Sequence, residues 1–273
     1  MPPFISLLTD FGPDGPAAVC RGVMLTIAPD ARILDIAHSI RKYAIADGAY
    51  LMAGAVPYIP TGVHVGVVDP GVGTERLPIG IRTARGDYLI GPDNGLLLPA
   101  AEALGGAVEA RVLENRDLML PKTSSTFHGR DIFSPIAAHL AMGVPFSSIG
   151  SELPVGRLEK LREPKPEIAD GELRTAVMFV DSFGNVRLAA RPDDLARAIG
   201  QLDAGRGVIV DFDGGGPPVT ERTTWQQTFG RVPVGTSLIY QDSSGYVALS
   251  DNQGNAASRL GVAVGRPVKV RAA

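Results

Sequence analysis

The sequence predicts an α/β domain with a largely parallel sheet, followed by a smaller all-β domain that resembles a barrel. In the first half, short apolar segments alternate with segments of helical spacing, which is typical of α/β domains. Toward the C-terminus, short strand-like segments and turns follow one another, as in small barrels or sandwiches. Residues 154–171 are rich in charge and contain closely spaced prolines, a linker signature. We therefore expect domains at 1–153 and 172–273.

The first domain is predicted to alternate strands and helices. Short apolar runs predict strands at 4–10, 32–38 and 63–69. Segments with helical spacing predict helices at 17–28, 43–55 and 95–104. Two apolar segments flank Arg85-Gly86, which predicts a hairpin there. A last helix is expected at 131–142, where Asp131 could act as the N-cap.

The second domain is predicted to consist mainly of short strands. Six segments have strand character and are bounded by turn residues: TAVMFVD, NVRLAA, GVIVDF, TSLIYQD, GYVALS and PVKVRA. One helix is expected at 192–199, and residues 255–257 could start a second, short helix. This pattern indicates a barrel or a sandwich, and it leaves open which of the two forms.

Composition excludes several classes of function. The 273 residues carry a net charge of -3 and no Lys/Arg tract, which argues against a nucleic-acid partner. The single cysteine, Cys20, excludes an internal disulfide framework and a Cys-based zinc site, and no histidine has metal-motif spacing. No apolar run approaches the roughly 20 residues that span a bilayer, and the N-terminus lacks signal-peptide character. We expect a soluble cytoplasmic protein without metal.

Two aspartates end predicted strands of the first domain. Asp10 and Asp69 each follow an apolar run, and ligands of open α/β sheets bind beyond the carboxyl ends of strands. Such a carboxylate could accept hydrogen bonds from ribose hydroxyls, or it could cap the next turn. Gly71 and Gly73 permit a sharp turn after Asp69, which could fold Arg76 back over the strand end. Neither a Walker-type nor a dinucleotide glycine motif is present.

Other candidate site residues lie in polar loops. FHGRD places His128 just before a predicted helix, after the polar run KTSSTFHG, whereas His38, His64 and His139 lie in apolar segments and are expected to be structural. In the second domain, VDSFGNV presents a turn, and residues 241–261 are rich in small polar side chains. Plain hairpin turns remain the alternative interpretation of both segments.

Six motifs together resemble one known family. They are LLTDFG at 7–12, VVDPGVGTER at 67–76, IGPDNGLL at 90–97, FHGRDIF at 127–133, VDSFGNV at 180–186 and NQGNAA at 252–257. In this order, they are similar to motifs of the S-adenosyl-L-methionine (SAM) hydroxide adenosyltransferases, the hydrolase branch of the fluorinase and chlorinase family. The resemblance covers essentially the whole chain.

The resemblance implies a reaction, an assembly and a set of site residues. It implies cleavage of SAM by water or hydroxide at C5′ to adenosine and L-methionine, without a cofactor. It also implies a homotrimer with sites between the first domain of one subunit and the second domain of its neighbour. Asp69, Arg76 and His128 match the family's water-handling set, and Asp10 matches its ribose-binding aspartate. The other implied substrate-binding residues are Asp69, Phe183, Asn185, Ser243, Asn255 and Ala256.

Two alternatives remain open. A SAM-dependent halogenase of the same fold is expected to carry an aromatic residue in place of Asp69 and to lack the Asp-Arg-His set. A non-catalytic adenosine- or SAM-binding protein would keep Asp10 and Asn185 but would not need Arg76 and His128. Because the sequence carries all of these residues, it favours the hydrolase.

Overall fold

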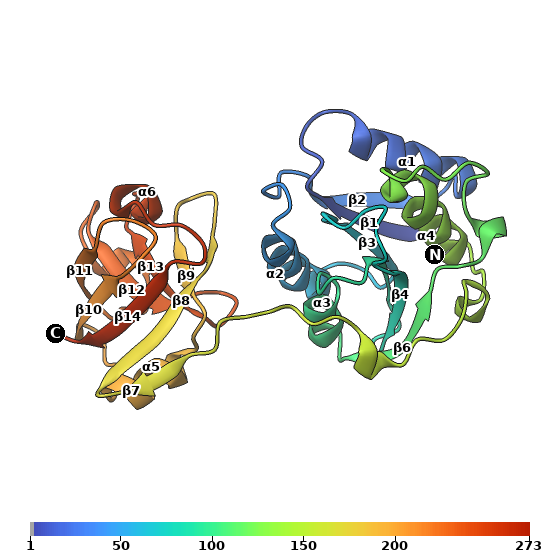
Figure 1. The fold of residues 1–273 in the computed structure, drawn as a ribbon. Helices are drawn as coiled ribbons and strands as arrows, with labels where there is room; N and C mark the ends of the chain where they lie inside the picture. Colours follow the sequence, from blue (N-terminus) through green and yellow to red (C-terminus); the bar gives the residue numbers. More distant parts are fainter. Residues whose placement is uncertain (1–2) are drawn as a thin grey trace. The chain divides into compact units, whose positions relative to one another are not determined.

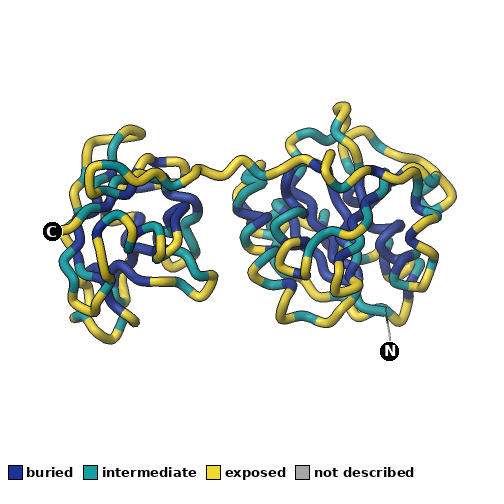
Figure 2. The backbone as a smooth tube through the Cα atoms, turned by 90° about the horizontal axis from the view of Figure 1, so that it is seen from below, coloured by how far each residue is buried: buried dark blue, intermediate teal, exposed yellow. Residues whose placement is uncertain are grey.

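The computed structural model describes residues 3–273, which form two compact units (Figure 1). The chain divides between Arg162 and Glu163. The segment 154–171, which we expected to be a linker, contains the 3-10 turn Val155–Arg157 and the short strand β7 (Glu167–Ala169). Buried residues fill the interior of each unit, and exposed residues cover its surface (Figure 2).

The first unit is built on a mixed, largely parallel sheet of six strands in the order β2-β1-β3-β5-β4-β6. β1, β2, β3 and β5 are parallel to one another, and β4 is antiparallel to both of its neighbours. The hairpin expected around Arg85-Gly86 is confirmed as β4 and β5. The strands are β1 (Phe4–Thr9), β2 (Arg32–Ala37), β3 (Val63–Val67), β4 (Pro78–Thr83), β5 (Tyr88–Pro92) and β6 (Ala107–Val112).

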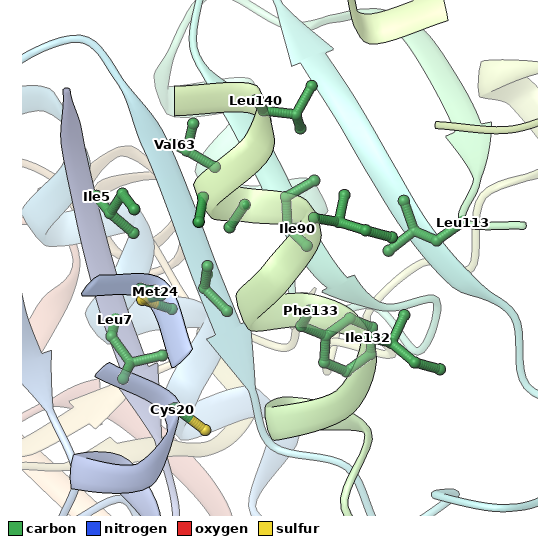
Figure 3. Packing of buried hydrophobic residues seen from close by; sticks show 14 of the residues in the cluster. Ile5, Leu7, Cys20, Met24, Val63, Ile90, Leu113, Ile132, Phe133 and Leu140 are labelled. Carbon is green, nitrogen blue, oxygen red and sulfur yellow. The ribbon is translucent and has the colours of Figure 1, made fainter. Parts of the chain in front are cut away.

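Helices cover both faces of this sheet because alternate strand residues point to opposite sides. On one face, α1 (Pro16–Ile27) and α4 (Ser134–Ala141) bury a cluster that includes Met24 and Phe133 (Figure 3). On the other face, α2 (Ile45–Ala55) and α3 (Leu98–Ala103) pack over a second cluster. The remaining short turns of this unit are Val56–Tyr58, Arg116–Leu118 and Phe146–Ser148.

The start of the last helix differs from our expectation. Residues Gly129–Phe133 form a π-helical turn, and α4 begins only at Ser134, so the prediction that Asp131 caps this helix is wrong. The buried Asp131 carboxylate instead accepts a hydrogen bond of 2.7 Å from the backbone N–H of Ser124 and pairs with Arg130. Asp131 therefore holds the preceding loop, which carries His128, against the helix.

The second unit is an antiparallel, nearly closed barrel-like sheet around one apolar core. Its strand order is β11-β10-β14-β8-β9-β13-β12, with β7 paired to β8, and a bridge between Trp225 and Ile239 links the two ends. This confirms the predicted fold class. Its further elements are β8 (Glu172–Val180), β9 (Val186–Leu188), β10 (Gly207–Phe212), β11 (Val219–Thr224), β12 (Ser237–Gln241), β13 (Val247–Asp251), β14 (Pro267–Ala272), α5 (Pro192–Ile199), α6 (Ala256–Leu260) and the turn Phe229–Arg231.

Candidate active site

Asp69, Arg76 and His128 form one hydrogen-bonded cluster in the first unit. Arg76 Nε lies 2.9 and 3.0 Å from the two carboxylate oxygens of Asp69, and Arg76 Nη2 also bonds Asp69 Oδ2. The same Nη2 lies 3.1 Å from His128 Nδ1. The side chains of Arg76 and Asp69 are only 9% and 5% exposed. The cluster is therefore a buried pair of opposite charges joined to an imidazole.

The glycine-rich turn after β3 brings Arg76 back to Asp69. The N–H groups of Val72 and Thr74 donate to the carbonyls of Asp69 and Gly71, which closes two successive turns. Gly73 has a φ of +78°, and a Cβ atom there would lie 2.5 Å from the carbonyl oxygen of Ser125. Because only glycine fits, this turn can lie directly against the loop that leads to His128.

The Arg76 guanidinium keeps one donor unused. It lies 5.3 Å from the ring centroid of Phe133, and its Nη1 is buried without a hydrogen-bond partner among the described residues. A buried N–H donor is costly unless a ligand or a water accepts its hydrogen bond. Within the described part of the chain, Nη1 is therefore an unpaired donor nitrogen that has almost no accessible surface of its own.

The contact with Arg76 determines the protonation of His128. A guanidinium can only donate hydrogen bonds, so His128 Nδ1 must accept, and the neutral ring carries its proton on Nε2. Burial, and then the positive charge of Arg76, lower the pKa of His128. We infer that His128 is a neutral imidazole that can donate a hydrogen bond from Nε2.

A cavity of about 240 Å³ gathers several predicted residues of the first unit. Asp10 lies in its wall, and its Oδ2 accepts a hydrogen bond of 2.9 Å from the backbone N–H of Tyr43. Arg76 is not in the wall and lies behind two residues that are, Asp69 and His128. The lining residues are Asp10, Phe11, Lys42, Tyr43, Val67, Asp69, Val72, Thr126, Phe127, His128 and Gly129.

The second unit has its own cavity of about 490 Å³, which includes Phe183, Asn185 and Ser243. Asp181 shapes its edge, because its carboxylate accepts hydrogen bonds from the N–H groups of Phe183 and Asn185 and from Asn185 Nδ2. Phe183 is 75% exposed there. The lining residues are Phe179, Asp181, Phe183, Asn185, Arg187, Phe229, Tyr240, Asp242, Ser243, Ala248, Asp251, Gln253 and Gly254.

Asn255 and Ala256 do not line this cavity. Asn255 Oδ1 accepts a hydrogen bond of 2.7 Å from Ser258 N–H and so caps α6. The Ala256 side chain is fully buried in the core. The start of α6 nevertheless contacts the turn with Phe183, because Ala257 N–H donates to the carbonyl of Gly184. Substrate binding by either residue stays a prediction.

Sequence reasoning missed part of both cavities. Asp181 follows β8 directly, within the recognised motif VDSFGNV, but the argument used for Asp10 and Asp69 does not apply to an antiparallel sheet. Phe11 and Phe127 lie beside recognised motifs, and their rings make an edge contact at 5.6 Å. No sequence signal indicated Tyr43, which we expected within a helix but which has a φ of 68°.

The other histidines form no metal site in the described part of the chain. His64 is fully buried between Ser6 Oγ at 2.8 Å and Asp87 Oδ1 at 2.9 Å, so solvent cannot reach it. Within residues 3–273, no group of three or more His, Cys, Asp or Glu side chains is arranged to hold a metal ion. No helix in the described part of the chain has the length and apolar character needed to cross a membrane.

A buried carboxylate–guanidinium–imidazole cluster beyond the carboxyl end of a strand in a largely parallel sheet is typical of an enzyme. The chain belongs to the SAM hydroxide adenosyltransferase family: the family's N-terminal domain model matches residues 5–150, and its C-terminal domain model matches residues 175–269. The resemblance found in the six motifs is thereby confirmed.

Similar proteins agree with this assignment. An (R)-S-adenosyl-L-methionine hydrolase of Salinispora tropica is 43% identical over 99% of this chain and 98% of its own. The hydrolase of the same name from Thermus thermophilus is 36% identical over 97% of this chain and 98% of its own. A fluorinase of an Actinoplanes species is 28% identical over 92% of this chain and 91% of its own. The crystal structure of an uncharacterized conserved protein from Thermotoga maritima has a TM-score of 0.87 and 33% identity, over 98% of this chain and 99% of that one.

Proposed function

We propose that the protein hydrolyses (R)-S-adenosyl-L-methionine to adenosine and L-methionine, with water or hydroxide attacking C5′. The observation that carries this proposal is the buried cluster of Asp69, Arg76 and His128 beside the cavity. Relatives named (R)-S-adenosyl-L-methionine hydrolase match nearly the full length of the chain at 36% and 43% identity, which supports it.

The cluster supplies what this substitution needs. The leaving group is a neutral thioether, so no general acid is required there. The nucleophilic oxygen must approach C5′ in line, and free water has a pKa of about 15.7. His128 Nε2–H donates a hydrogen bond to that oxygen, and the positive charge of Arg76, which lies behind His128, also stabilises the negative charge that develops there. Both oxygens of Asp69 bond Arg76, so Asp69 orients the guanidinium. Asp69 also lines the cavity, and its carboxylate accepts the proton that the attacking water loses and passes it to solvent.

The substrate is held by groups from both units. Asp10 binds the ribose hydroxyls, and Oδ1 of its carboxylate makes no hydrogen bond within the described residues. Phe183, Asn185 and Ser243 contact the rest of the substrate from the larger cavity. The protein is a homotrimer, and each active site lies between two subunits. It acts in the cytoplasm, a reducing compartment in which a free thiol such as that of the buried Cys20 persists. The reaction uses no cofactor and no metal ion.

One assay tests the proposal. Purified protein is incubated with SAM, with and without chloride and with and without a metal chelator, and the products are separated by chromatography. We expect adenosine and methionine in equal amounts under all four conditions. Arg76→Ala should lose the activity, whereas Arg82→Ala should keep it, because Arg82 forms a partly exposed pair with Glu109. A chlorinated nucleoside formed with chloride, or no adenosine at all, would overturn the proposal.

A further inference from the structure

The turn after β1 carries two cavity-lining residues, Asp10 and Phe11, and another part of the chain holds it. That part is the connection from β2 to α2, residues 38–44. The N–H of Gly12 donates a hydrogen bond of 2.8 Å to the carbonyl oxygen of His38. The backbone of the turn is thus attached to the connection at one end.

The His38 ring adds a second attachment. Its Nδ1 lies 2.9 Å from the hydroxyl of Thr9, which is fully buried. The same hydroxyl accepts a hydrogen bond of 3.3 Å from the N–H of Phe11, so its own proton is free to go to His38 Nδ1. His38, Thr9 and Phe11 are therefore linked in one hydrogen-bonded chain across the Asp10 turn.

The other nitrogen of the His38 ring faces Asp35, a residue of β2. Its Nε2 lies 3.0 Å from Asp35 Oδ1, outside hydrogen-bond geometry, and because Thr9 donates to Nδ1 the ring is neutral and forms no ion pair there. Asp35 Oδ2 pairs with Arg21 of α1. The His38 side chain is only 18% exposed. Asp35 belongs to β2, which ends just before His38, and Arg21 holds Asp35 from α1, so the partly buried ring has little freedom to leave Thr9.

The same connection reaches Asp10 from its other end. The N–H of Tyr43 donates to Asp10 Oδ2 at 2.9 Å, and Tyr43 adopts a φ of 68°, which is unfavourable for a residue with a side chain. The connection between His38 and Tyr43 therefore holds the turn at two points. His38 bonds the backbone of Gly12 and the hydroxyl of Thr9, and Tyr43 bonds the Asp10 carboxylate.

We propose that His38 is a positioning residue for the nucleoside: it fixes the turn so that Asp10 presents its carboxylate to both ribose hydroxyls. This inference rests on the proposed role of Asp10. A mobile turn would have to be ordered when the ligand binds, which would cost affinity. Because ribose is bound in ground and transition states alike, loss of His38 should raise KM and leave kcat almost unchanged.

The two amide replacements of His38 separate its two contacts. Asn places an amide near the position of Nδ1 and can still bond Thr9, whereas Gln reaches toward the position of Nε2 and loses Thr9. His139→Gln is the matched control, because His139 is a partly buried histidine of α4 that does not line the cavity. Thermal unfolding of the three variants verifies that each is folded.

The first measurement does not depend on activity. Amide hydrogen exchange of Phe11 in the ligand-free, full-length protein reports directly on the turn. We expect exchange about tenfold faster in His38→Gln, and nearly wild-type exchange in His38→Asn and His139→Gln. Equal protection of Phe11 in all of these proteins would overturn the proposal, whatever the protein's substrate.

The second measurement links His38 to ribose. Calorimetry compares adenosine with 2′,3′-dideoxyadenosine, which lacks the hydroxyls that Asp10 would bind. His38→Gln should weaken adenosine binding about tenfold and leave dideoxyadenosine binding unchanged. Equal weakening of both ligands would overturn the positioning role. If wild-type protein binds no adenosine while Phe11 exchange responds as expected, the proposed function fails and the attachment of the turn by His38 stands.

Discussion

Arg76 joins every member of the proposed catalytic cluster, because it contacts both oxygens of Asp69, the ring of His128 and the face of Phe133. Lysine keeps the charge but lacks the planar fork of donors needed for these contacts. We expect Arg76→Lys to lower turnover about a hundred- to thousand-fold, because His128 is no longer held and one donor to the developing oxyanion is lost.

Calorimetry and steady-state kinetics check this prediction together. Adenosine affinity should be nearly unchanged in Arg76→Lys, because Arg76 acts on the attacking oxygen through its charge and through His128 and does not contact the nucleoside. Asp10→Ala should show the opposite pattern, with weaker adenosine binding and a smaller effect on turnover. If Arg76→Lys loses adenosine binding and keeps its turnover at saturation, Arg76 is a ligand-holding group and the mechanism is wrong.

His128 makes stability and activity dependent on pH. Burial and Arg76 hold its pKa in the folded protein below the usual value of about 6.5. The folded state therefore binds this proton less readily, and the free energy of unfolding should fall as pH drops below about 6.5 toward the folded pKa. Turnover should fall only at lower pH, around the folded pKa, because a protonated Nδ1 cannot accept the hydrogen bond of Arg76.

Denaturant unfolding between about pH 5 and 7.5 tests the sign of this effect. His128→Gln should unfold with a shallower dependence on pH than the wild type. His139, whose pKa is also lowered by burial, is present in both proteins, so it does not contribute to the difference. Parallel pH curves for the two proteins would contradict the prediction.

At the scale of the elements, the sequence predicts strand ends well. Asp10 and Asp69 follow β1 and β3, which are parallel neighbours, so their positions follow from apolar runs and strand polarity alone. β11 was missed because its sequence VTERTT is polar, and the π-turn Gly129–Phe133 was missed because Asp131 bonds Ser124 instead of capping a helix. The pairing of β11 with β10 and the hydrogen bond between Asp131 and Ser124 depend on tertiary packing, which local sequence patterns do not encode.

The loop from Asp69 to Arg76 should tolerate no side chain at Gly73. Gly73→Ala would place Cβ against the Ser125 carbonyl and strain a positive φ, whereas Gly86 also has a positive φ but has open space around it. We expect Gly86→Ala to lower the free energy of unfolding by about 1–3 kcal/mol, and Gly73→Ala to lower it further. Chemical denaturation measures both values.

Activity distinguishes the same two variants. Turnover should fall strongly in Gly73→Ala, because the shifted loop moves Arg76 away from His128, and it should stay near wild type in Gly86→Ala, which lies in the β4–β5 hairpin. Full activity of a folded Gly73→Ala protein would show that the close approach of the two loops is not needed.

At the scale of the whole molecule, the proposed ligand groups are divided between two units. Asp10, Asp69 and His128 line the cavity of the first unit, whereas Asn185 and Ser243 line that of the second. Each set could be predicted from short motifs. The pairing of the two sets, within one chain or between subunits, depends on assembly, and no single-chain pattern determines it.

Mixed subunits test the homotrimer with shared sites. Arg76→Ala disables the first unit and Asn185→Ala disables the second, so each homotrimer should be inactive. If every site joins the first unit of one subunit to the second unit of its neighbour, random mixed trimers restore activity to about a quarter of wild type. The matched control mixes Arg76→Ala with His128→Ala, which disable the same unit and cannot complement each other. Light scattering verifies a trimer, and absence of complementation in verified mixed trimers would place each site within one chain.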